Sequence, residues 1–264
     1  FADICCAIIG RAPAAGLHLD ENRRATVVVR LQGVSSELIG RDVLYPVLGG
    51  LIGRLVGRGV PVVDGLPPGV SEDRLKALGA ASAATGTVGM FHMVGSTPEA
   101  STLVDALHGR EPDEEVAVTA ADLRAARDRL STTTDDRLRT VSLGTPHYSI
   151  TEIGRLVELL GDGRVADGVA FYVSTGRDIY HEVELRGWAD RLADAGVTVV
   201  TDTCTYFTPI IEDLGGTAMT DSAKWAYYAP NNLGVEVVFG SVEDCVASAM
   251  TGRVVRDESI WADA

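Results

Sequence analysis

The sequence is poor in cysteine and lysine, and it contains no long apolar run. Four cysteines in 264 residues are too few for a disulfide-dense scaffold. Lys76 and Lys224 are the only lysines, so nearly all of the 23 basic residues are arginine. The longest apolar stretch, Val43–Ile52, is too short to cross a bilayer. These shortages exclude disulfide scaffolds and membrane-spanning helices.

Positive charge is scarce as a whole. The 37 acidic residues outnumber the basic ones, and the formal net charge is −14. This balance argues against a nucleic acid or an anionic membrane as partner. The chain begins at Phe1 without Met or a charged-then-apolar leader, so we expect a piece of a longer or processed cytoplasmic protein. Neither a Gly-x-Ser-x-Gly elbow nor a phosphate-binding glycine loop follows any predicted strand.

Short β-branched runs alternate with segments of helical spacing. This alternation predicts an α/β fold with mainly parallel sheets covered by helices on both faces. The predicted strands are Ala25–Leu31, Val60–Asp64, Thr87–Met93, Val116–Thr119, Thr140–Leu143, Val169–Ser174, Val197–Thr201 and Val235–Phe239. The predicted helices centre on Arg74–Ser82, Ile153–Leu160 and Val183–Leu192, with starts at Thr97, Ser149 and Ser241.

The polar run Ser131–Asp136 is the best candidate for a domain boundary, because it has no periodicity and follows a charged helical segment. We therefore predict one α/β unit over residues 25–131 and a second over 137–264. Residues 1–24 are then expected to be the remainder of an upstream segment.

Ligands of open α/β sheets bind at the carboxyl ends of the strands, so polar residues there are the first candidates. Four such places stand out, and a predicted aromatic helix over Met219–Pro230 carries Lys224. The four are His92 with Gly95–Glu99, Gly144–Ser149, Asp202–Cys204, and Gly240–Ser241 followed by Cys245.

Each candidate also has a structural interpretation. His92 is as easily a structural hydrogen-bonding residue as a catalytic one. Gly144 and Ser149 suit a turn and a helix cap, whereas His147 is not explained in that way. Cys204 has polar neighbours. Cys245 alone would be assigned to the core, and so would Cys5 and Cys6 within the apolar stretch Ala2–Ile9.

Several motifs in order along nearly the whole chain resemble the aconitase X family. The resemblance rests on Gly10–Pro13, Gly16–Leu19, Glu21–Arg23, Lys76–Ala81, Phe91–His92, Gly95–Ala100, Gly144–Ser149, Asp202–Cys204, Met219–Pro230 and Gly240–Cys245. It implies aconitase-like α/β/α three-layer units with mainly parallel sheets. Two residues depart from the family pattern: Asp221 stands where asparagine is commoner, and Tyr227 where histidine is commoner.

The resemblance also implies an iron–sulfur-dependent hydro-lyase that acts on a small hydroxy acid. Cys204 and Cys245 would be two of three cluster thiolates, with the third upstream of residue 1. A swivel domain, fused or encoded as a small subunit, would close the site. The expected substrate is cis-3-hydroxy-L-proline, with (R)-5-phosphomevalonate as the alternative. A non-catalytic ligand-binding α/β domain is an alternative of another class.

The candidate catalytic residues are His147, Lys224, Ser149 and His92. The candidate substrate-binding residues are Thr145, Ser222, Thr97 and Arg23. Lys224 and the helix start at Thr145–Ser149 would hold the substrate carboxylate. Lys76 is expected to be incidental on an exposed helical face.

Overall fold

The computed structural model describes residues 1–212 and 214–262, and it contains two sheets in which every strand pair is parallel. The first has the order β3-β2-β1-β4 and the second the order β7-β6-β5-β8-β9. The strands are β1 (Val27–Gln32), β2 (Pro61–Asp64), β3 (His92–Met93), β4 (Glu114–Thr119), β5 (Leu138–Tyr148), β6 (Ala170–Thr175), β7 (Val197–Thr201), β8 (Thr217–Thr220) and β9 (Glu236–Phe239). The predicted α/β class with parallel sheets is confirmed.

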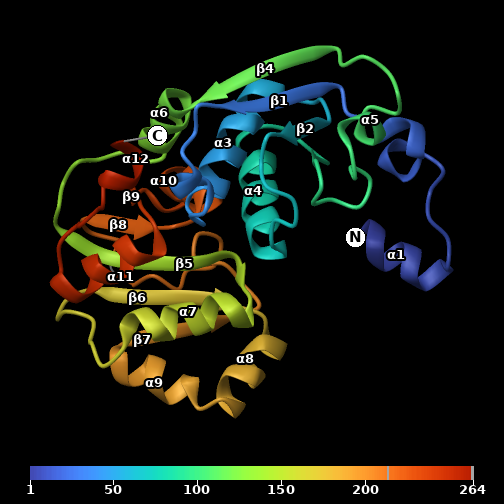
Figure 1. The fold of residues 1–264 in the computed structure, drawn as a ribbon. Helices are drawn as coiled ribbons and strands as arrows, with labels where there is room; N and C mark the ends of the chain where they lie inside the picture. The colour runs from blue at the N-terminus through green and yellow to red at the C-terminus, as the bar shows by residue number, and fades with distance from the viewer. Residues whose placement is uncertain (213, 263–264) are drawn as a thin grey trace.

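Helices connect and cover these strands (Figure 1). They are α1 (Ala2–Ile9), α2 (Ser36–Ile39), α3 (Leu44–Val56), α4 (Glu72–Thr85), α5 (Leu103–Ala106), α6 (Ala120–Asp128), α7 (Ile150–Leu160), α8 (Arg177–Leu185), α9 (Trp188–Ala195), α10 (Ala223–Leu233), α11 (Val242–Thr251) and α12 (Ser259–Ala262), with 3-10 turns at Gly16–His18 and Asp20–Asn22. Among the described residues, no helix is long and apolar enough to cross a membrane.

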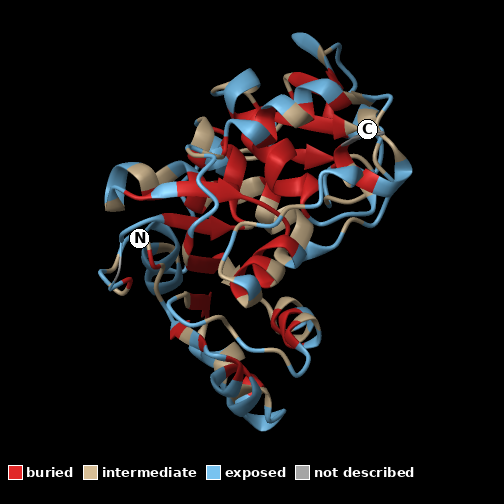
Figure 2. Cartoon of the chain, turned by 90° about the vertical axis from the view of Figure 1, so that its left-hand side faces the viewer, coloured by how far each residue is buried: buried red, intermediate tan, exposed pale blue. Residues whose placement is uncertain are grey.

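The two sheets share a central helical layer. One apolar cluster joins Val29 and Val63 of the first sheet, helices α3, α4, α6 and α10, and Tyr172 and Phe239 of the second sheet. Because side chains alternate across a strand, the other face of the second sheet packs against α7, α9 and α11. The remaining face of the first sheet packs against α5. Buried residues accordingly run through the middle of the molecule (Figure 2).

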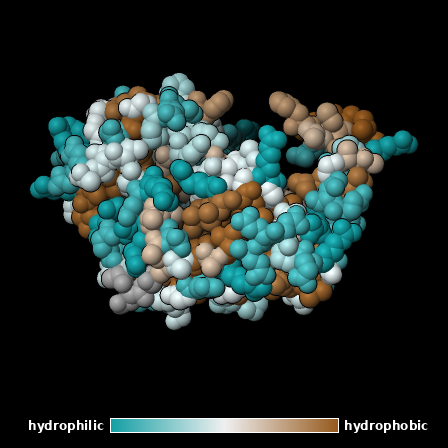
Figure 3. All heavy atoms as spheres, turned by 90° about the horizontal axis from the view of Figure 1, so that it is seen from above, coloured by the Kyte–Doolittle hydropathy of each residue, from teal (hydrophilic) through white to brown (hydrophobic). Residues whose placement is uncertain are grey.

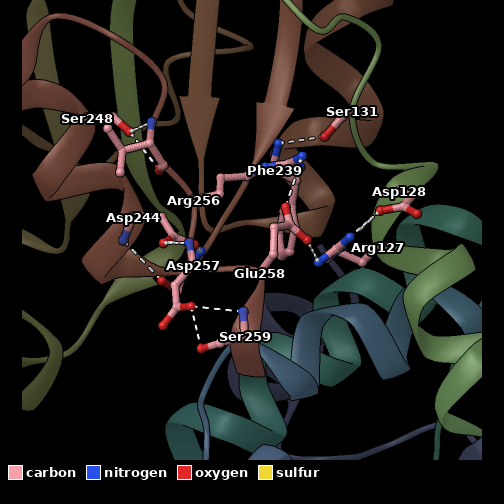
Figure 4. A network of polar contacts seen from close by, with 12 residues as sticks. Arg127, Asp128, Ser131, Phe239, Asp244, Ser248, Arg256, Asp257, Glu258 and Ser259 are labelled. Carbon is pink, nitrogen blue, oxygen red and sulfur yellow. Dashed lines mark hydrogen bonds and ion pairs between the residues drawn. The ribbon is translucent and has the colours of Figure 1, made fainter. Parts of the chain in front are cut away.

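The segment after α11 ties this helix to the first sheet's helices (Figure 4). Asp244 of α11 accepts a hydrogen bond from the Asp257 amide at 2.8 Å. Glu258 accepts one from Arg127 of α6 at 2.6 Å, and the Arg127 guanidinium also lies over the Trp261 ring. The two sheets are thus linked at their surface as well as through the core.

Several sequence predictions need correction. The segment Thr87–Met93 is a strand only at its last two residues. No helix starts at Thr97, because its hydroxyl closes a turn on Met93 instead. The predicted aromatic helix Met219–Pro230 is preceded by strand β8 and begins only at Ala223. The predicted helix over Val183–Leu192 is two helices, separated at Gly187 with φ of 70°.

The apolar stretch Ala2–Ile9 forms helix α1, but its cysteines are not in a core. None of its residues is buried, and Cys5 is exposed. In Figure 3 brown and tan atoms gather at the right-hand end of the molecule, where α1 lies in Figure 1. The core assignment of Cys5 and Cys6 is therefore wrong, since an apolar helix was taken to imply burial.

Candidate functional site

A cleft of about 500 Å³ lies where α4 of the first half faces the carboxyl ends of β5, β8 and β9. A narrow recess of about 30 Å³ adjoins it and contains Lys224. Both cavities are lined by Pro46, Ala77, Tyr148, Glu152 and Asp221. This position agrees with the rule that ligands of open α/β sheets bind beyond the carboxyl ends of the strands.

Lys76 lies at the centre of a charged cluster beside the cleft. Its ammonium donates to Asp73 Oδ1 at 2.9 Å, to the His147 carbonyl at 3.0 Å and to Glu152 Oε2 at 2.6 Å. The Lys76 side chain is 30% exposed, and that of Glu152 is 25% exposed. The expectation that Lys76 is incidental on an exposed face is wrong, because the cluster joins α4 to the end of β5 and the start of α7.

Burial and neighbouring charges shift the pKa values of the two carboxyl groups of this cluster in opposite directions. Burial raises the pKa of Glu152 to about 7, although Lys76 and the Ser149 amide favour the charged form. Burial also acts to raise the pKa of Asp73, but hydrogen bonds from Lys76 and Ser149 outweigh it, and the net pKa is lowered. Glu152 can therefore exchange a proton near neutral pH.

Tyr148 and Asp221 form a second pair that lines both cavities. The Tyr148 hydroxyl donates to Asp221 Oδ2. The other oxygen, Oδ1, is buried and has no hydrogen-bond partner among the described residues. Burial raises the pKa of Asp221 to about 6, while the Tyr148 hydrogen bond lowers it. Burial and the Asp221 charge raise the pKa of Tyr148 well above its usual value.

Three predicted site residues meet in the recess: Thr145, Ser222 and Lys224. Ser222 caps α10 by accepting from the Trp225 amide, and its hydroxyl donates to the Thr145 carbonyl. Strand β5 continues through Thr145 to Tyr148 rather than turning after Leu143. That extension places Thr145 in the recess, where its Oγ1 is buried without a partner among the described residues.

His147 and Ser149 flank the cleft but do not line either cavity. The Ser149 hydroxyl accepts from the Glu152 amide, as the predicted cap requires, and donates to Asp73 Oδ2 at 2.8 Å. A ring nitrogen of His147 lies 3.2 Å from the Thr203 carbonyl. Their catalytic roles stay predictions.

The structure places His92, Thr97 and Arg23 together at the first sheet, away from the lining of both cavities. His92 is 1% exposed, and its Nε2 lies 2.7 Å from the Arg23 carbonyl. The Arg23 side chain pairs with Glu99 at 2.7 Å. These contacts agree with the structural interpretation of His92.

The two predicted cluster ligands follow the two edge strands of the second sheet, β7 and β9. Next to the half-buried Cys204, Tyr206 stacks on Tyr228 of α10. Cys245 is buried in the apolar cluster on the α11 side, and burial raises its pKa well above the usual value. Among the described residues, no group of three His, Cys, Asp or Glu side chains could hold a metal ion. The two thiols alone therefore do not make a cluster site.

Sequence reasoning missed Asp73, Lys76 and Glu152 as residues of the cleft or its rim, and it included Tyr148 only within the candidate segment Gly144–Ser149. Lys76 carried a signal, because it is one of two lysines in an arginine-rich chain. From the sequence, Glu152 can be recognised only as the acid of a capping box at the start of α7. Its second contact, the ion pair with Lys76, requires a residue of α4.

Two parallel sheets and a polar cleft beyond the strand ends define an open α/β protein with a ligand site. Residues 25–128 match the family model described as aconitase X second domain, and residues 138–251 match aconitase X third domain. The crystal structure of Thermococcus kodakaraensis aconitase X in its holo form superimposes with a TM-score of 0.80 at 28% identity, covering 93% of this chain and 60% of that one. The chain belongs to the aconitase X family.

Curated relatives share this family and are longer. Cis-3-hydroxy-L-proline dehydratase of Pseudomonas aeruginosa is 39% identical over 264 residues, which cover 99% of this chain and 45% of the relative. The dehydratase of that name from Hypocrea jecorina is 41% identical, covering 96% and 43%. Phosphomevalonate dehydratase large subunit of Methanothermobacter thermautotrophicus is 40% identical, covering 89% and 56%. The chain spans about half the length of these relatives.

Proposed function

We propose that this chain forms the cleft-bearing part of a hydro-lyase that dehydrates cis-3-hydroxy-L-proline to Δ1-pyrroline-2-carboxylate. Similarity to the two dehydratases of that name extends over nearly the whole chain, at about 40% identity. The charge of the cleft is the structural observation that carries the choice of substrate.

Acidic side chains outnumber basic ones in the lining of the cleft. Asp42, Asp73, Glu152, Asp221 and Glu243 face it, against Arg74 and Arg155. Each arginine is already paired: Arg74 with Asp42 at 2.6 Å and Arg155 with Glu243 at 3.2 Å. A doubly charged phosphate would meet repulsion there, whereas a zwitterionic amino acid would not. This balance favours hydroxyproline.

The residues of the cleft can be given roles in this reaction. Dehydration breaks the C2–H and C3–O bonds, forms a C2=C3 double bond and releases water, and the enamine product tautomerises to the cyclic imine. Lys224 would hold the substrate carboxylate in the recess. Glu152, with its pKa near neutral, is the proposed proton-exchanging group.

The second candidate substrate is (R)-5-phosphomevalonate. Its support is the 40% identity to the archaeal large subunit, which is as high as that to the hydroxyproline enzymes. Lys76 and Lys224 supply cations close to the cleft. Binding of phosphomevalonate in the cleft would require Arg74 or Arg155 to leave its acidic partner.

A cluster and a closing part complete the proposal. We propose that Cys204 is a ligand of an iron–sulfur cluster whose remaining ligands include residues outside this chain segment, and that a swivel domain or small subunit covers the cleft. The test is the visible absorbance of the full-length protein purified without oxygen. Cys204→Ser should abolish it and Cys5→Ser, on exposed α1, should not. Equal spectra in both variants would contradict the assignment.

The function is tested by assaying the full-length protein, with any partner subunit, on both substrates side by side. We expect turnover of cis-3-hydroxy-L-proline, lost in Lys224→Met and largely lost in Lys224→Arg, because the compact ammonium fits the recess and a guanidinium does not. Turnover of phosphomevalonate alone would overturn the proposal. Ligand binding without turnover would instead support a binding domain.

A further inference from the structure

The recess beside the cleft contains two opposite charges that belong to one turn of backbone. Asp221 and Lys224 flank Ser222, the cap of α10, and both line the recess. No salt bridge within 4.0 Å joins Asp221 or Lys224 to another described residue, although many other acidic residues form one. Both charged groups thus line the recess without a salt-bridge partner among the described residues.

The two oxygens of Asp221 differ in their surroundings. Tyr148 donates its hydroxyl to Oδ2 and so fixes the carboxylate in place. Oδ1 is buried and has no hydrogen-bond partner among the described residues, although it belongs to a group that lines both cavities. A buried carboxylate oxygen is stable only with a donor, and a cationic N–H is the strongest donor available.

An α-amino acid presents the complementary pair of charges. In a 2-carboxypyrrolidine the ring nitrogen and the carboxylate are attached to the same carbon, so one cation and one anion lie side by side. Lys224 and Asp221 offer one anion site and one cation site, three residues apart at the start of one helix and on the lining of the same recess. A ligand without a ring cation would leave Asp221 Oδ1 unpaired.

We propose that Asp221 determines substrate specificity by accepting a hydrogen bond at Oδ1 from the ring ammonium of the substrate, while Lys224 binds its carboxylate. This inference rests on the proposed function and deepens it, because it names the chemical group that the site recognises. Tyr148 is a positioning residue, since it acts through the carboxylate that it holds.

The test compares two probes that differ in one atom. L-proline carries the ring ammonium, and tetrahydrofuran-2-carboxylate has an oxygen in its place. Binding of each to the full-length protein is measured by calorimetry. We expect the wild type to prefer L-proline by about 10-fold or more, the usual worth of a hydrogen bond to a charged group. Asp221→Asn should reduce that preference to about 2-fold or less.

Lys224→Met is the matched control, because it should weaken both probes and leave their ratio unchanged. Near-ultraviolet circular dichroism checks that Asp221→Asn, which keeps the side chain's shape and its acceptor for Tyr148, remains folded; Asp221→Ser is the second variant if it does not. A preference unchanged in a folded Asp221 variant would overturn the inference, even if that variant lost turnover.

The outcomes separate this inference from the proposed function. If the wild type turns over cis-3-hydroxy-L-proline but binds the two probes equally, only the role of Asp221 falls. If it binds neither probe and turns over no hydroxyproline, the proposed function falls, and the inference with it.

Discussion

Two of the three contacts of the Lys76 ammonium come from outside its own helix, α4. Its partners Glu152 and the His147 carbonyl belong to the second sheet and its helix, while Asp73 lies one turn away. Removal of the ammonium would leave the partly buried carboxyl groups of Asp73 and Glu152 without their cation, with Ser149 still donating to them. Removing one partner of a buried ion pair lowers the free energy of unfolding strongly, whereas the same change at an exposed ion pair has little effect.

We therefore expect Lys76→Met to lower the free energy of unfolding by about 2 kcal/mol at pH 8, less than for a fully buried pair because its partners are partly exposed. Urea unfolding measures the change. Arg41→Met is the control, since Arg41 pairs with Glu37 on the exposed face of α2 and its loss should cost less than about 0.5 kcal/mol. Equal losses in the two variants would contradict the importance of the Lys76 cluster.

Glu152 makes stability depend on pH in a predictable direction. Its pKa rises from 4.5 to about 7 on folding, so the folded state binds more protons between these values. Stability from this group is complete below pH 4.5 and is lost as the pH rises through 7. The loss amounts to at most about 3 kcal/mol.

Glu152→Gln should remove this dependence. Relative to the variant, the wild type should become less stable in urea between pH 5 and pH 8. Glu158→Gln, on the exposed side of the same helix, should keep the wild-type profile. If all three proteins show parallel profiles, burial does not control the pKa of Glu152.

The sequence pointed to the recess better than to the cleft. Thr145 was predicted because it follows a predicted strand, and Ser222 and Lys224 because they lie in the Met219–Pro230 segment that resembles the family. Glu152 and Asp73 were not, because their role comes from Lys76, which reaches across from another element. For His92 the sequence left a catalytic and a structural interpretation open, since a strand-end histidine next to a polar turn suits both, and its contact with the Arg23 carbonyl agrees with the structural one.

At the scale of elements, glycines decide how closely α3 and α4 pack. A Cβ on Gly49 would lie 2.2 Å from the Leu78 carbonyl oxygen, inside the backbone of the neighbouring helix. A Cβ on Gly50 would meet only the Thr85 methyl group at 3.9 Å. The two adjacent glycines of one helix thus have opposite roles.

We expect Gly49→Ala to destabilise the protein by about 3 kcal/mol, because the helices must separate. Gly50→Ala should stabilise it by about 0.5 kcal/mol or more, since alanine is the better helix former. Thermal unfolding of the two variants measures both effects. A loss of stability in both would mean that the helix tolerates no side chain on either face.

The elements themselves were predictable where local signals are strong. The helix starts at Ser149 and Ser241 are present as predicted, and both are capping boxes, which involve only residues three apart. Strand β8 was missed because Ala218 and Met219 interrupt its β-branched residues, unlike in the equally short β2 and β9, and because its pairing comes from β5 and β9. The extension of β5 to Tyr148 likewise depends on pairing with Thr175 of β6.

At the scale of the whole molecule, the shared helical layer couples the two sheets. Trp225 of α10 is fully buried in the cluster that also contains Val29 of the first sheet and Phe239 of the second. Its indole N–H donates to Thr205 at 2.8 Å. Each sheet therefore buries its inner face against a helical layer that the other sheet also covers.

Coupling of this kind predicts one cooperative unfolding transition for both halves. Trp188 lies on α9 beside the second sheet, and Trp261 lies beside Arg127 of α6, so variants that retain one of them, with the other and Trp225 replaced by Phe, report on each half. Their fluorescence midpoints in urea should coincide with each other and with the far-ultraviolet circular dichroism. In the same reporters, Trp225→Ala in place of Trp225→Phe should lower the free energy of unfolding by an equal amount for all three signals, about 4 kcal/mol relative to Trp225, because it opens a cavity in the layer that both sheets use. Separate midpoints for the two reporters, with Trp225→Ala moving only that of Trp188, would show that the two sheets fold independently of each other.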